Sequence, residues 1–271
     1  MDTILSKTIG LIAGDGELPV KHAQSAQAQG YDVFTISYSP DNRKLLENYS
    51  KKVFTCGPGE VQKAIDLMKG EGVSQITFIG KVSKGLLFRN PRLDFRAVRM
   101  IKEATRLNDD AVMLYIIDDL AKEGISVLDQ TLFLKEFFPK KGVLGKIKPD
   151  ENQLADIEYG FQIAKEIGRL DLGQSVVAQN KMILAVETIE GTDKTIERGC
   201  RMGNGKATVV KVSKPNQDRR FDMPAVGLRT LQTMKKYGAN VLAIEAGETF
   251  AVEIDKMIDF VNKNNMIFVA V

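Results

Sequence analysis

Short apolar runs alternate with stretches of helical length along the first half of the chain. The apolar runs predict buried strands over residues 9–13, 31–37, 52–56, 75–79 and 125–128. Helices are predicted between them, over residues 19–29, 60–69, 94–105 and 109–123. Because a strand, a helix and a second strand make a right-handed crossover between parallel neighbours, this alternation predicts an α/β domain with a parallel, doubly wound sheet.

The second half of the chain has a different pattern. Two predicted strands, 176–179 and 182–187, flank Asn180-Lys181 and predict a hairpin. Helices are further predicted over 151–167, after Gly191, from Pro224 to residue 237 and over 255–262, and strands over 207–212, 241–245 and 267–271. An antiparallel hairpin beside strands that alternate with helices predicts a mixed α/β domain.

The organisation into domains follows from a composition change near the middle. Residues 137–150 are rich in Pro, Gly and Lys, as linkers are. The sequence therefore predicts an N-terminal domain over 1–135, a linker over 136–150 and a C-terminal domain over 151–271. The N-terminus lacks a signal-peptide pattern, and no run approaches the ~18 apolar residues of a membrane span. We therefore expect a cytoplasmic protein, peripheral at a membrane at most.

The composition excludes several kinds of site. Lys and Arg number 38 and Asp and Glu 35, a net charge of +3, which is far from the basic surplus of a nucleic-acid binder. The single histidine, His22, excludes histidine-rich metal centres and is expected to be structural. Cys56 and Cys200 form no C-x-x-C pair, so we expect two small hydrophobes in a reducing compartment.

Two turns follow predicted strands of the first half, at the edge where open α/β sheets bind ligands. Gly14 and Gly16 lie in the first turn, and Gly80 and Lys81 in the second. Pro19 replaces the third glycine of the dinucleotide fingerprint, so a nicotinamide cofactor is not expected. Two interpretations remain open: the turns line a ligand site with Lys81 at a phosphate, or they are tight turns with a solvated lysine.

Acidic and basic residues gather on two segments of the second half. Glu187, Glu190 and Asp193 lie close together in sequence, and residues 214–224 combine Lys, Arg and Asp. Carboxylate oxygens bind hard cations such as Mg²⁺ or Mn²⁺, and Lys or Arg beside them can bind phosphate oxygens. A water on such a metal is a nucleophile near neutral pH. The two segments predict a metal and phosphate site, with solvated surface loops as the alternative.

Several segments, in order along nearly the whole chain, carry a family resemblance. They are I-A-G-D-G-E-L-P at 12–19, I-G-K-V at 79–82, D-D-A at 109–111, G-V-L-G at 142–145, D-L-G-Q-S-V-V at 171–177, E-T-I-E-G-T-D at 187–193, K-P-N-Q-D-R-R-F-D-M-P at 214–224 and E-A-G at 245–247. The sequence resembles the LpxI family. Met223 stands where the family usually has Leu, and Asn108 where it usually has Gly.

The resemblance implies a fold and a reaction. It implies a Rossmann-like N-terminal domain and a C-terminal domain special to the family, with the ligand held between them. The family are the UDP-2,3-diacylglucosamine pyrophosphatases of lipid A biosynthesis. They hydrolyse this substrate to UMP and 2,3-diacylglucosamine 1-phosphate (lipid X) by attack of water on the α-phosphorus, with a divalent metal. The family's key aspartate maps to Asp222, which is therefore the expected catalytic residue.

The pattern and the resemblance together define the expected site. Asp222 binds the metal, Mg²⁺ or Mn²⁺, or orients the water. The other candidate metal ligands are Glu187, Glu190, Asp193 and Asp218. The candidate substrate-binding residues are Gly14, Gly16, Gly80, Lys81, Gly191, Thr192, Lys214, Gln217 and Arg220.

The expected partners are the substrate and lipid X, and no nucleic acid. Interleaved basic and apolar residues over 84–99 suit transient contact with the inner membrane, or equally a solvated helix. A homodimer is left open. Two other functions also stay open, a non-catalytic protein that binds a sugar nucleotide or lipid phosphate and a nucleotide-dependent transferase.

Overall fold

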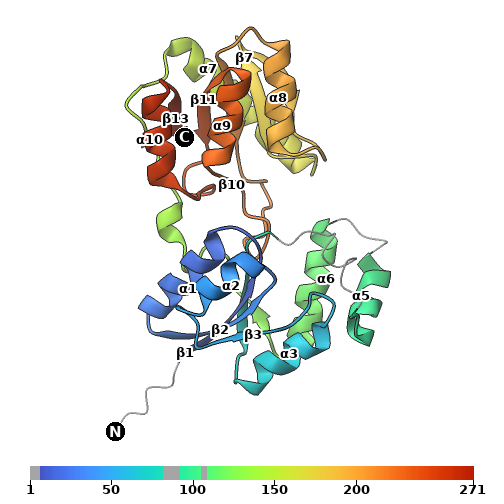
Figure 1. Ribbon diagram of the computed structural model, residues 1–271. Helices are drawn as coiled ribbons and strands as arrows, with labels where there is room; N and C mark the ends of the chain where they lie inside the picture. Colours follow the sequence, from blue (N-terminus) through green and yellow to red (C-terminus); the bar gives the residue numbers. More distant parts are fainter. Residues whose placement is uncertain (1–6, 82–91, 105–108) are drawn as a thin grey trace. The chain divides into compact units, whose positions relative to one another are not determined.

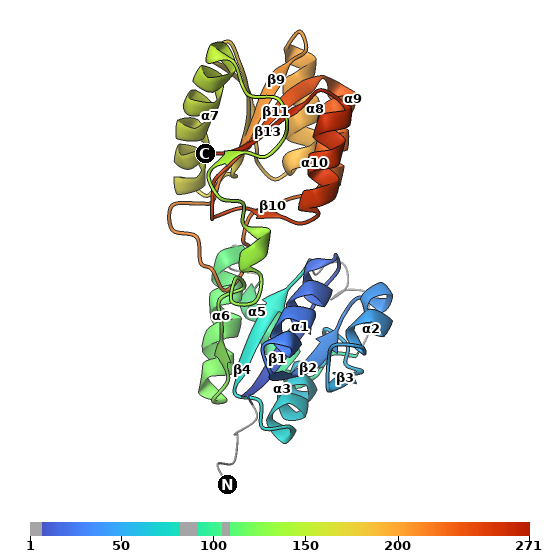
Figure 2. The same ribbon diagram turned by 90° about the vertical axis from the view of Figure 1, so that its left-hand side faces the viewer.

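The computed structural model describes residues 7–81, 92–104 and 109–271 (Figures 1 and 2). The chain divides into two compact units. The first contains the residues up to Lys135 together with Arg219–Phe221, and the second contains Glu136–Asp218 and Asp222–Val271. The chain therefore returns once to the first unit before it completes the second.

The first unit is built on a five-stranded sheet in the order β3-β2-β1-β4-β5, and every pair of neighbours is parallel. Its strands are β1 (Lys7–Ala13), β2 (Tyr31–Ser37), β3 (Lys52–Phe54), β4 (Gln75–Ile79) and β5 (Ser126–Val127). The helices among its described residues are α1 (Leu18–Ala28), α2 (Pro40–Leu46), α3 (Val61–Gly70), α5 (Phe95–Ala104) and α6 (Asp109–Lys122). The predicted α/β fold with a parallel sheet is confirmed, and the sequence pattern missed α2.

One face of this sheet forms an apolar core with two helices. Ile12 of β1 and Ile76 of β4 are buried there with Ile65 of α3 and Leu120 of α6. Successive side chains of a strand point to opposite faces, so Thr77, next to Ile76, belongs to the other face.

The single histidine is buried on that other face. His22 of α1 has its Nε2 3.1 Å from the hydroxyl of Thr77, and its ring meets the edge of Phe133 at 5.0 Å between centroids. Burial lowers its pKa from 6.5 to about 3, so the ring is neutral at physiological pH. His22 is a structural residue, as the sequence predicts.

The second unit is mixed α/β. Its six-stranded sheet has the order β6-β13-β11-β9-β7-β8, with β9, β11 and β13 parallel and the other pairs antiparallel. The strands are β6 (Gly142–Val143), β7 (Ser175–Gln179), β8 (Met182–Val186), β9 (Ala207–Lys211), β11 (Ala239–Ile244) and β13 (Ile267–Ala270). The helices are α7 (Glu151–Arg169), α8 (Thr192–Met202), α9 (Leu228–Tyr237) and α10 (Ile254–Lys263), with a 3₁₀ turn, η1 (Lys135–Phe137), before them.

Helices cover both faces of this sheet. Val210 of β9 packs with Ile157 of α7 on one face, and its neighbour Val209 packs with Ile196 of α8 and Leu231 of α9 on the other. Figure 2 shows α7 on one side of the strands and α10 on the opposite side. The alternation of buried side chains along β9 therefore makes this strand the centre of a three-layer unit.

One predicted element of this unit differs from the structure, and the predicted linker contains a short strand. Residues 136–150, the predicted linker, belong to the second unit, where Gly142–Val143 forms β6 against β13. The helix predicted from Pro224 begins at Leu228 instead. Residues Ala225–Val226 form β10 and pair with β12 (Phe250–Ala251), which gives their backbone groups strand partners rather than helical ones.

Arg219–Phe221 is anchored in the first unit by backbone and side chains. The carbonyl of Arg219 accepts a hydrogen bond from the N–H of Gln130 at 2.8 Å, and its Nε lies 3.0 Å from a carboxylate oxygen of Asp129. Phe221 is 5% exposed and lies in the core with Ile12 and Leu120. This short segment therefore completes the core of a unit whose other residues precede it by a long stretch of chain.

Candidate active site

The two glycine turns of the first unit pair with each other. They follow β1 and β4, which are neighbours in the sheet. The N–H of Asp15 donates to the carbonyl of Lys81 at 2.9 Å, and the N–H of Lys81 donates to the carbonyl of Asp15 at 3.1 Å. The side-chain amide of Asn42 donates to the carbonyls of Gly14 and Gly16 at 3.1 and 2.7 Å. These contacts hold the two turns together as one structure.

This pairing leaves no room for side chains at two of the glycines. A Cβ on Gly14 would lie 2.6 Å from the carbonyl oxygen of Lys81, and one on Gly80 would lie 2.7 Å from that of Asp15. Close packing thus accounts for both glycines, in agreement with the tight-turn interpretation. Because the N–H groups of Gly14 and Asp15 donate to backbone carbonyls, they are not available to a phosphate. Substrate binding by Gly14, Gly16, Gly80 and Lys81 stays a prediction.

In the second unit a buried lysine lies where three strands and the start of a helix meet. Lys211 ends the central strand β9 and is 6% exposed. Its Nζ donates to the hydroxyl of Thr192 at 2.8 Å and to that of Ser175 at 3.4 Å. A carboxylate oxygen of Glu187 lies 3.9 Å from the same Nζ. Strands β7, β8 and β9 and the start of α8 thus converge on one ammonium group.

Glu187 and Thr192 form a fixed pair beside this ammonium. Glu187 follows β8 and is 8% exposed, and its Oε1 accepts a hydrogen bond from the hydroxyl of Thr192 at 2.8 Å. Its Oε2 has no hydrogen-bond partner among the described residues. Thr192 is the first residue of α8, and Gly191 before it has φ 80°, a left-handed conformation that suits glycine. The predicted residues Glu187, Gly191 and Thr192 are therefore brought together.

Three carboxylates act on the charge of Lys211. Burial lowers the pKa of its ammonium, because a charged group loses hydration in the interior, and the negative charges of Glu187, Asp222 and Asp193 oppose this effect. Glu187 and Asp193 come from one predicted segment and Asp222 from the other. The charges of three of the five predicted metal ligands therefore act on a cationic side chain that the sequence analysis did not single out, and Glu187 lies 3.9 Å from its ammonium.

Asp222 is placed by an unusual backbone. Its φ is 55°, in the left-handed region, and the side-chain amide of Gln217 donates to its carbonyl at 3.0 Å. Its carboxylate is exposed and lies 3.7 Å from the Nζ of Lys214, which also binds Asp171 at 2.7 Å. The structure thus brings Asp222, Lys214 and Gln217 together, with the carboxylate accessible to a ligand.

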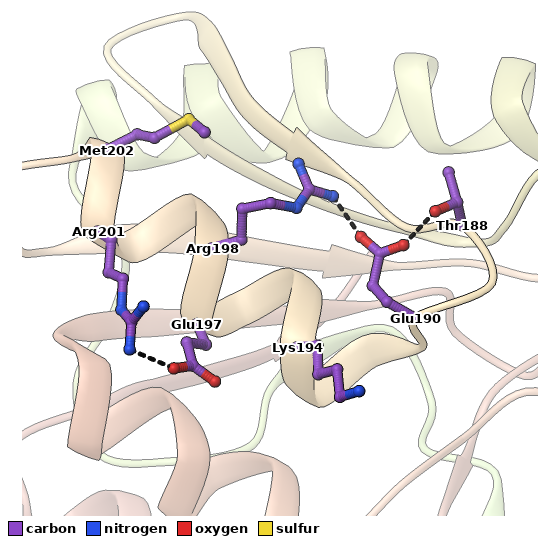
Figure 3. A pocket seen from close by; sticks show the side chains of 7 residues that line it. All are labelled: Thr188, Glu190, Lys194, Glu197, Arg198, Arg201 and Met202. Carbon is purple, nitrogen blue, oxygen red and sulfur yellow. Dashed lines mark hydrogen bonds and ion pairs between the residues drawn. The ribbon is translucent and has the colours of Figure 1, made fainter.

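The other predicted acidic residues have separate partners. Glu190 accepts hydrogen bonds from Thr188 and Arg198, which lower its pKa from 4.5 to about 2, and Figure 3 shows its carboxylate pointing toward these two side chains. Asp193 lies 2.8 Å from the Nε of Arg229. Asp218 and Arg220 are half-buried on either side of Arg219, Asp218 in the second unit and Arg220 in the segment that belongs to the first.

These positions test whether the described side chains fit a bound divalent ion. Within residues 7–81, 92–104 and 109–271, no three His, Cys, Asp or Glu side chains lie together as a group that could hold a metal ion. Glu190 is paired with Arg198, and an ammonium lies beside Glu187. The side chains do not fit a preformed metal site, and the five predicted ligands stay a prediction.

Sequence reasoning missed Lys211 and a half-buried ion pair between Lys165 and Glu245. Lys165 of α7 lies 2.7 Å from Glu245, whose other oxygen accepts hydrogen bonds from the N–H and the hydroxyl of Ser213, both at 2.8 Å. This pair fixes the start of the loop that carries Lys214. The available signal for Lys211 was a lysine inside an otherwise apolar run, A-T-V-V-K-V, where a charge needs a partner.

Gly173 allows the loop before β7 to approach Glu187. A Cβ there would lie 2.3 Å from the carbonyl oxygen of Glu187, a distance that real contacts do not reach. Gly173→Ala must therefore move the backbone of Glu187, and we expect a loss of about 1–3 kcal/mol in the free energy of unfolding. Thermal unfolding followed by circular dichroism measures this loss. Gly70→Ala is the control, because nothing lies within 4 Å of its Cβ, and equal melting temperatures for the two variants would contradict the prediction.

The membrane contact, the cellular location and the homodimer stay predictions. No described helix combines the length and the apolar composition that a membrane crossing needs. Of the basic and apolar segment 84–99, residues up to 91 lie outside the described residues.

Comparisons with known proteins cover nearly the whole chain. The family model described as LpxI N-terminal domain matches residues 8–137, and the one described as LpxI C-terminal domain matches residues 140–269. The protein named UDP-2,3-diacylglucosamine pyrophosphatase LpxI, from Caulobacter vibrioides, is 31% identical over 263 residues, which is 93% of each chain.

Solved structures give a much weaker likeness. The ADP complex of N5-carboxyaminoimidazole ribonucleotide synthetase, titled purK, is 16% identical with a TM-score of 0.28, over 72% of this chain and 45% of that one. The biotin carboxylase subunit of pyruvate carboxylase is 13% identical with a TM-score of 0.28, over 73% of this chain and 41% of that one. The chain thus spans less than half the length of either structure.

Proposed function

Because the chain belongs to the LpxI family, we propose that it hydrolyses the pyrophosphate bond of UDP-2,3-diacylglucosamine as a step of lipid A biosynthesis. The products are UMP and 2,3-diacylglucosamine 1-phosphate. Family membership makes the chain a hydrolase, and the substrate comes from the name of the relative in Caulobacter vibrioides. The observation that supports the reaction here is an accessible carboxylate, Asp222, 3.7 Å from the ammonium of Lys214.

In the proposed step, Asp222 accepts a proton from a water molecule, and the oxygen of that water attacks the α-phosphorus. The new bond joins the water oxygen to that phosphorus. The bond from the α-phosphorus to the bridging oxygen breaks, and the bridging oxygen leaves with the sugar phosphate. Lys214 binds the phosphate oxygens, on which negative charge accumulates in the transition state. The same role for Arg220 stays a prediction from the sequence. The proton on Asp222 then passes to solvent.

The start of α8 is proposed to bind a second phosphate oxygen. The unpaired N–H groups in the first turn of a helix attract anions, and Gly191 leaves space there because nothing lies within 4 Å of its Cβ position. Mg²⁺ or Mn²⁺ is part of the proposal as an ion that neutralises pyrophosphate charge when it is bound. The membrane contact predicted from the sequence would serve the two acyl chains.

Hydrolysis in H₂¹⁸O tests the reaction and the position of attack. The full chain is incubated with UDP-2,3-diacylglucosamine and Mg²⁺ or Mn²⁺, and the products are analysed by mass spectrometry. We expect the label in UMP. Label in the lipid product would place the attack on the other phosphorus and contradict the mechanism. Binding of the substrate without turnover would contradict the proposed function and leave a non-catalytic binding protein.

A further inference from the structure

We propose that Lys211 is a positioning residue of this site, and that its ammonium, in place of a protein-bound metal ion, is the resident cation beside Glu187. A divalent ion then enters the site together with the pyrophosphate oxygens of a nucleotide. The second statement rests on the proposed function, whereas the first concerns the protein alone.

The hydrogen bonds of Lys211 define its position. An ammonium has three N–H donors and no acceptor. Two of the donors have hydroxyl acceptors, Thr192 at 2.8 Å and Ser175 at 3.4 Å. Because Lys211 donates to the oxygen of Thr192, the proton of that hydroxyl must point elsewhere, and it points to Oε1 of Glu187 at 2.8 Å. Lys211 thereby fixes the orientation of the first side chain of α8.

The positive charge of Lys211 stabilises the second carboxylate oxygen of Glu187. This Oε2 is buried, has no hydrogen-bond partner among the described residues and lies 3.9 Å from the ammonium. A buried carboxylate without compensation is strongly unfavourable, so the nearby positive charge is what stabilises it. Removing that charge would leave Glu187 as an uncompensated anion aimed toward Lys211.

The same geometry disfavours a metal ion held by the protein alone. A divalent cation on Glu187 would lie close to the ammonium and be repelled by it. No three potential ligands are grouped among the described residues. Mg²⁺ in proteins commonly takes one or two carboxylates and completes its coordination with water and substrate phosphates. The exposed carboxylate of Asp222 can supply such a single ligand, and the pyrophosphate supplies oxygens that the protein lacks.

Titration of the full chain with Mn²⁺, followed by the electron paramagnetic resonance signal of the free ion, tests the proposal without any turnover. We expect the unaltered protein to bind Mn²⁺ more weakly than about 1 mM, as for an ion held mainly by water. Addition of UDP should produce a protein-bound Mn²⁺, after subtraction of the Mn²⁺–UDP complex measured without protein. One tightly bound Mn²⁺ per chain in the absence of UDP would overturn the proposal.

Lys211→Met tests the role of the ammonium. Methionine keeps an unbranched side chain and removes the charge, so the carboxylates should bind Mn²⁺ at least about tenfold more tightly without UDP. Lys211→Arg keeps the charge and should bind Mn²⁺ as weakly as the unaltered protein. Lys146→Met is the matched control, since Lys146 is an exposed lysine of the same unit and its replacement changes the net charge equally. A purely structural role would not raise the affinity for a cation.

Two outcomes of the variants would contradict the inference. The first is a Lys211→Met protein that is folded by circular dichroism and binds Mn²⁺ no more tightly than Lys146→Met. The second, for an unaltered protein that hydrolyses the substrate, is equal kcat for these two variants. If Lys211→Met does not fold, the titration of the unaltered protein still decides the question. If the unaltered protein binds Mn²⁺ as expected but does not hydrolyse the substrate, the proposed function is contradicted and the role of Lys211 is not.

Discussion

Asp222→Asn is expected to lower kcat for pyrophosphate hydrolysis by about 10²–10⁴-fold, the range over which a positioned general base contributes. An amide cannot accept the proton of the attacking water, although it has nearly the shape of the carboxylate. Asparagine is preferred to alanine here because φ at this position is 55°, a conformation that Asn adopts much more readily than Ala. The folded structure should therefore be kept, with an unchanged melting temperature. Initial rates of UMP release measure the effect.

Asp171→Asn is the matched control for this variant. Asp171 also has a left-handed backbone, with φ 56°, and it also pairs with Lys214, at 2.7 Å. Its replacement removes the same charge beside the same lysine but leaves Asp222 in place. We expect this control to keep a kcat at least about tenfold above that of Asp222→Asn. Equal losses in the two variants would show that the charge near Lys214 is what matters, and would contradict a general base at Asp222.

Phe221→Ala is expected to cause the largest loss of stability, about 3–5 kcal/mol in the free energy of unfolding, as for other buried phenylalanines. The ring is 5% exposed and packs in the core of the first unit, and alanine would leave a cavity there. Urea unfolding followed by circular dichroism measures the change. Phe95→Ala is the control, because that ring is 98% exposed. An equal loss in the free energy of unfolding for Phe95→Ala and Phe221→Ala would contradict the prediction.

The sequence predicts the long elements well because their local and tertiary preferences agree. The runs at 31–37 and 75–79 form β2 and β4 with the predicted bounds, since buried strands of a parallel sheet are continuously apolar. The short pair β10 and β12 has no such signal. Each has two residues, and each becomes a strand only because the other lies beside it. The 136–150 stretch has the composition of a linker, but β13 offers its backbone a partner.

The residues of the candidate site also divide into those that the sequence predicts and those that only the fold brings together. Asp222 and the acidic segment 187–193 are found from sequence because their residue types recur in a family pattern. The arrangement around Lys211 is different, since Ser175 and the segment that contains Glu187 and Thr192 are both distant from Lys211 in sequence and reach it through the order of the strands. The pattern of the chain also gives no sign that Glu190 pairs with Arg198. Which carboxylates share one neighbourhood is thus a property of the fold.

The return of the chain at Arg219–Phe221 has a consequence for synthesis on the ribosome. The strands of the first unit emerge early, yet a part of its core is supplied by a residue translated only after most of the second unit. Until then the site of the Phe221 ring is open to water, and the nascent first unit has an incomplete apolar core. Its last step of folding must therefore await translation of a segment that the second unit flanks on both sides. Folding of the first unit is therefore coupled to the synthesis of the segment that also contains Asp222.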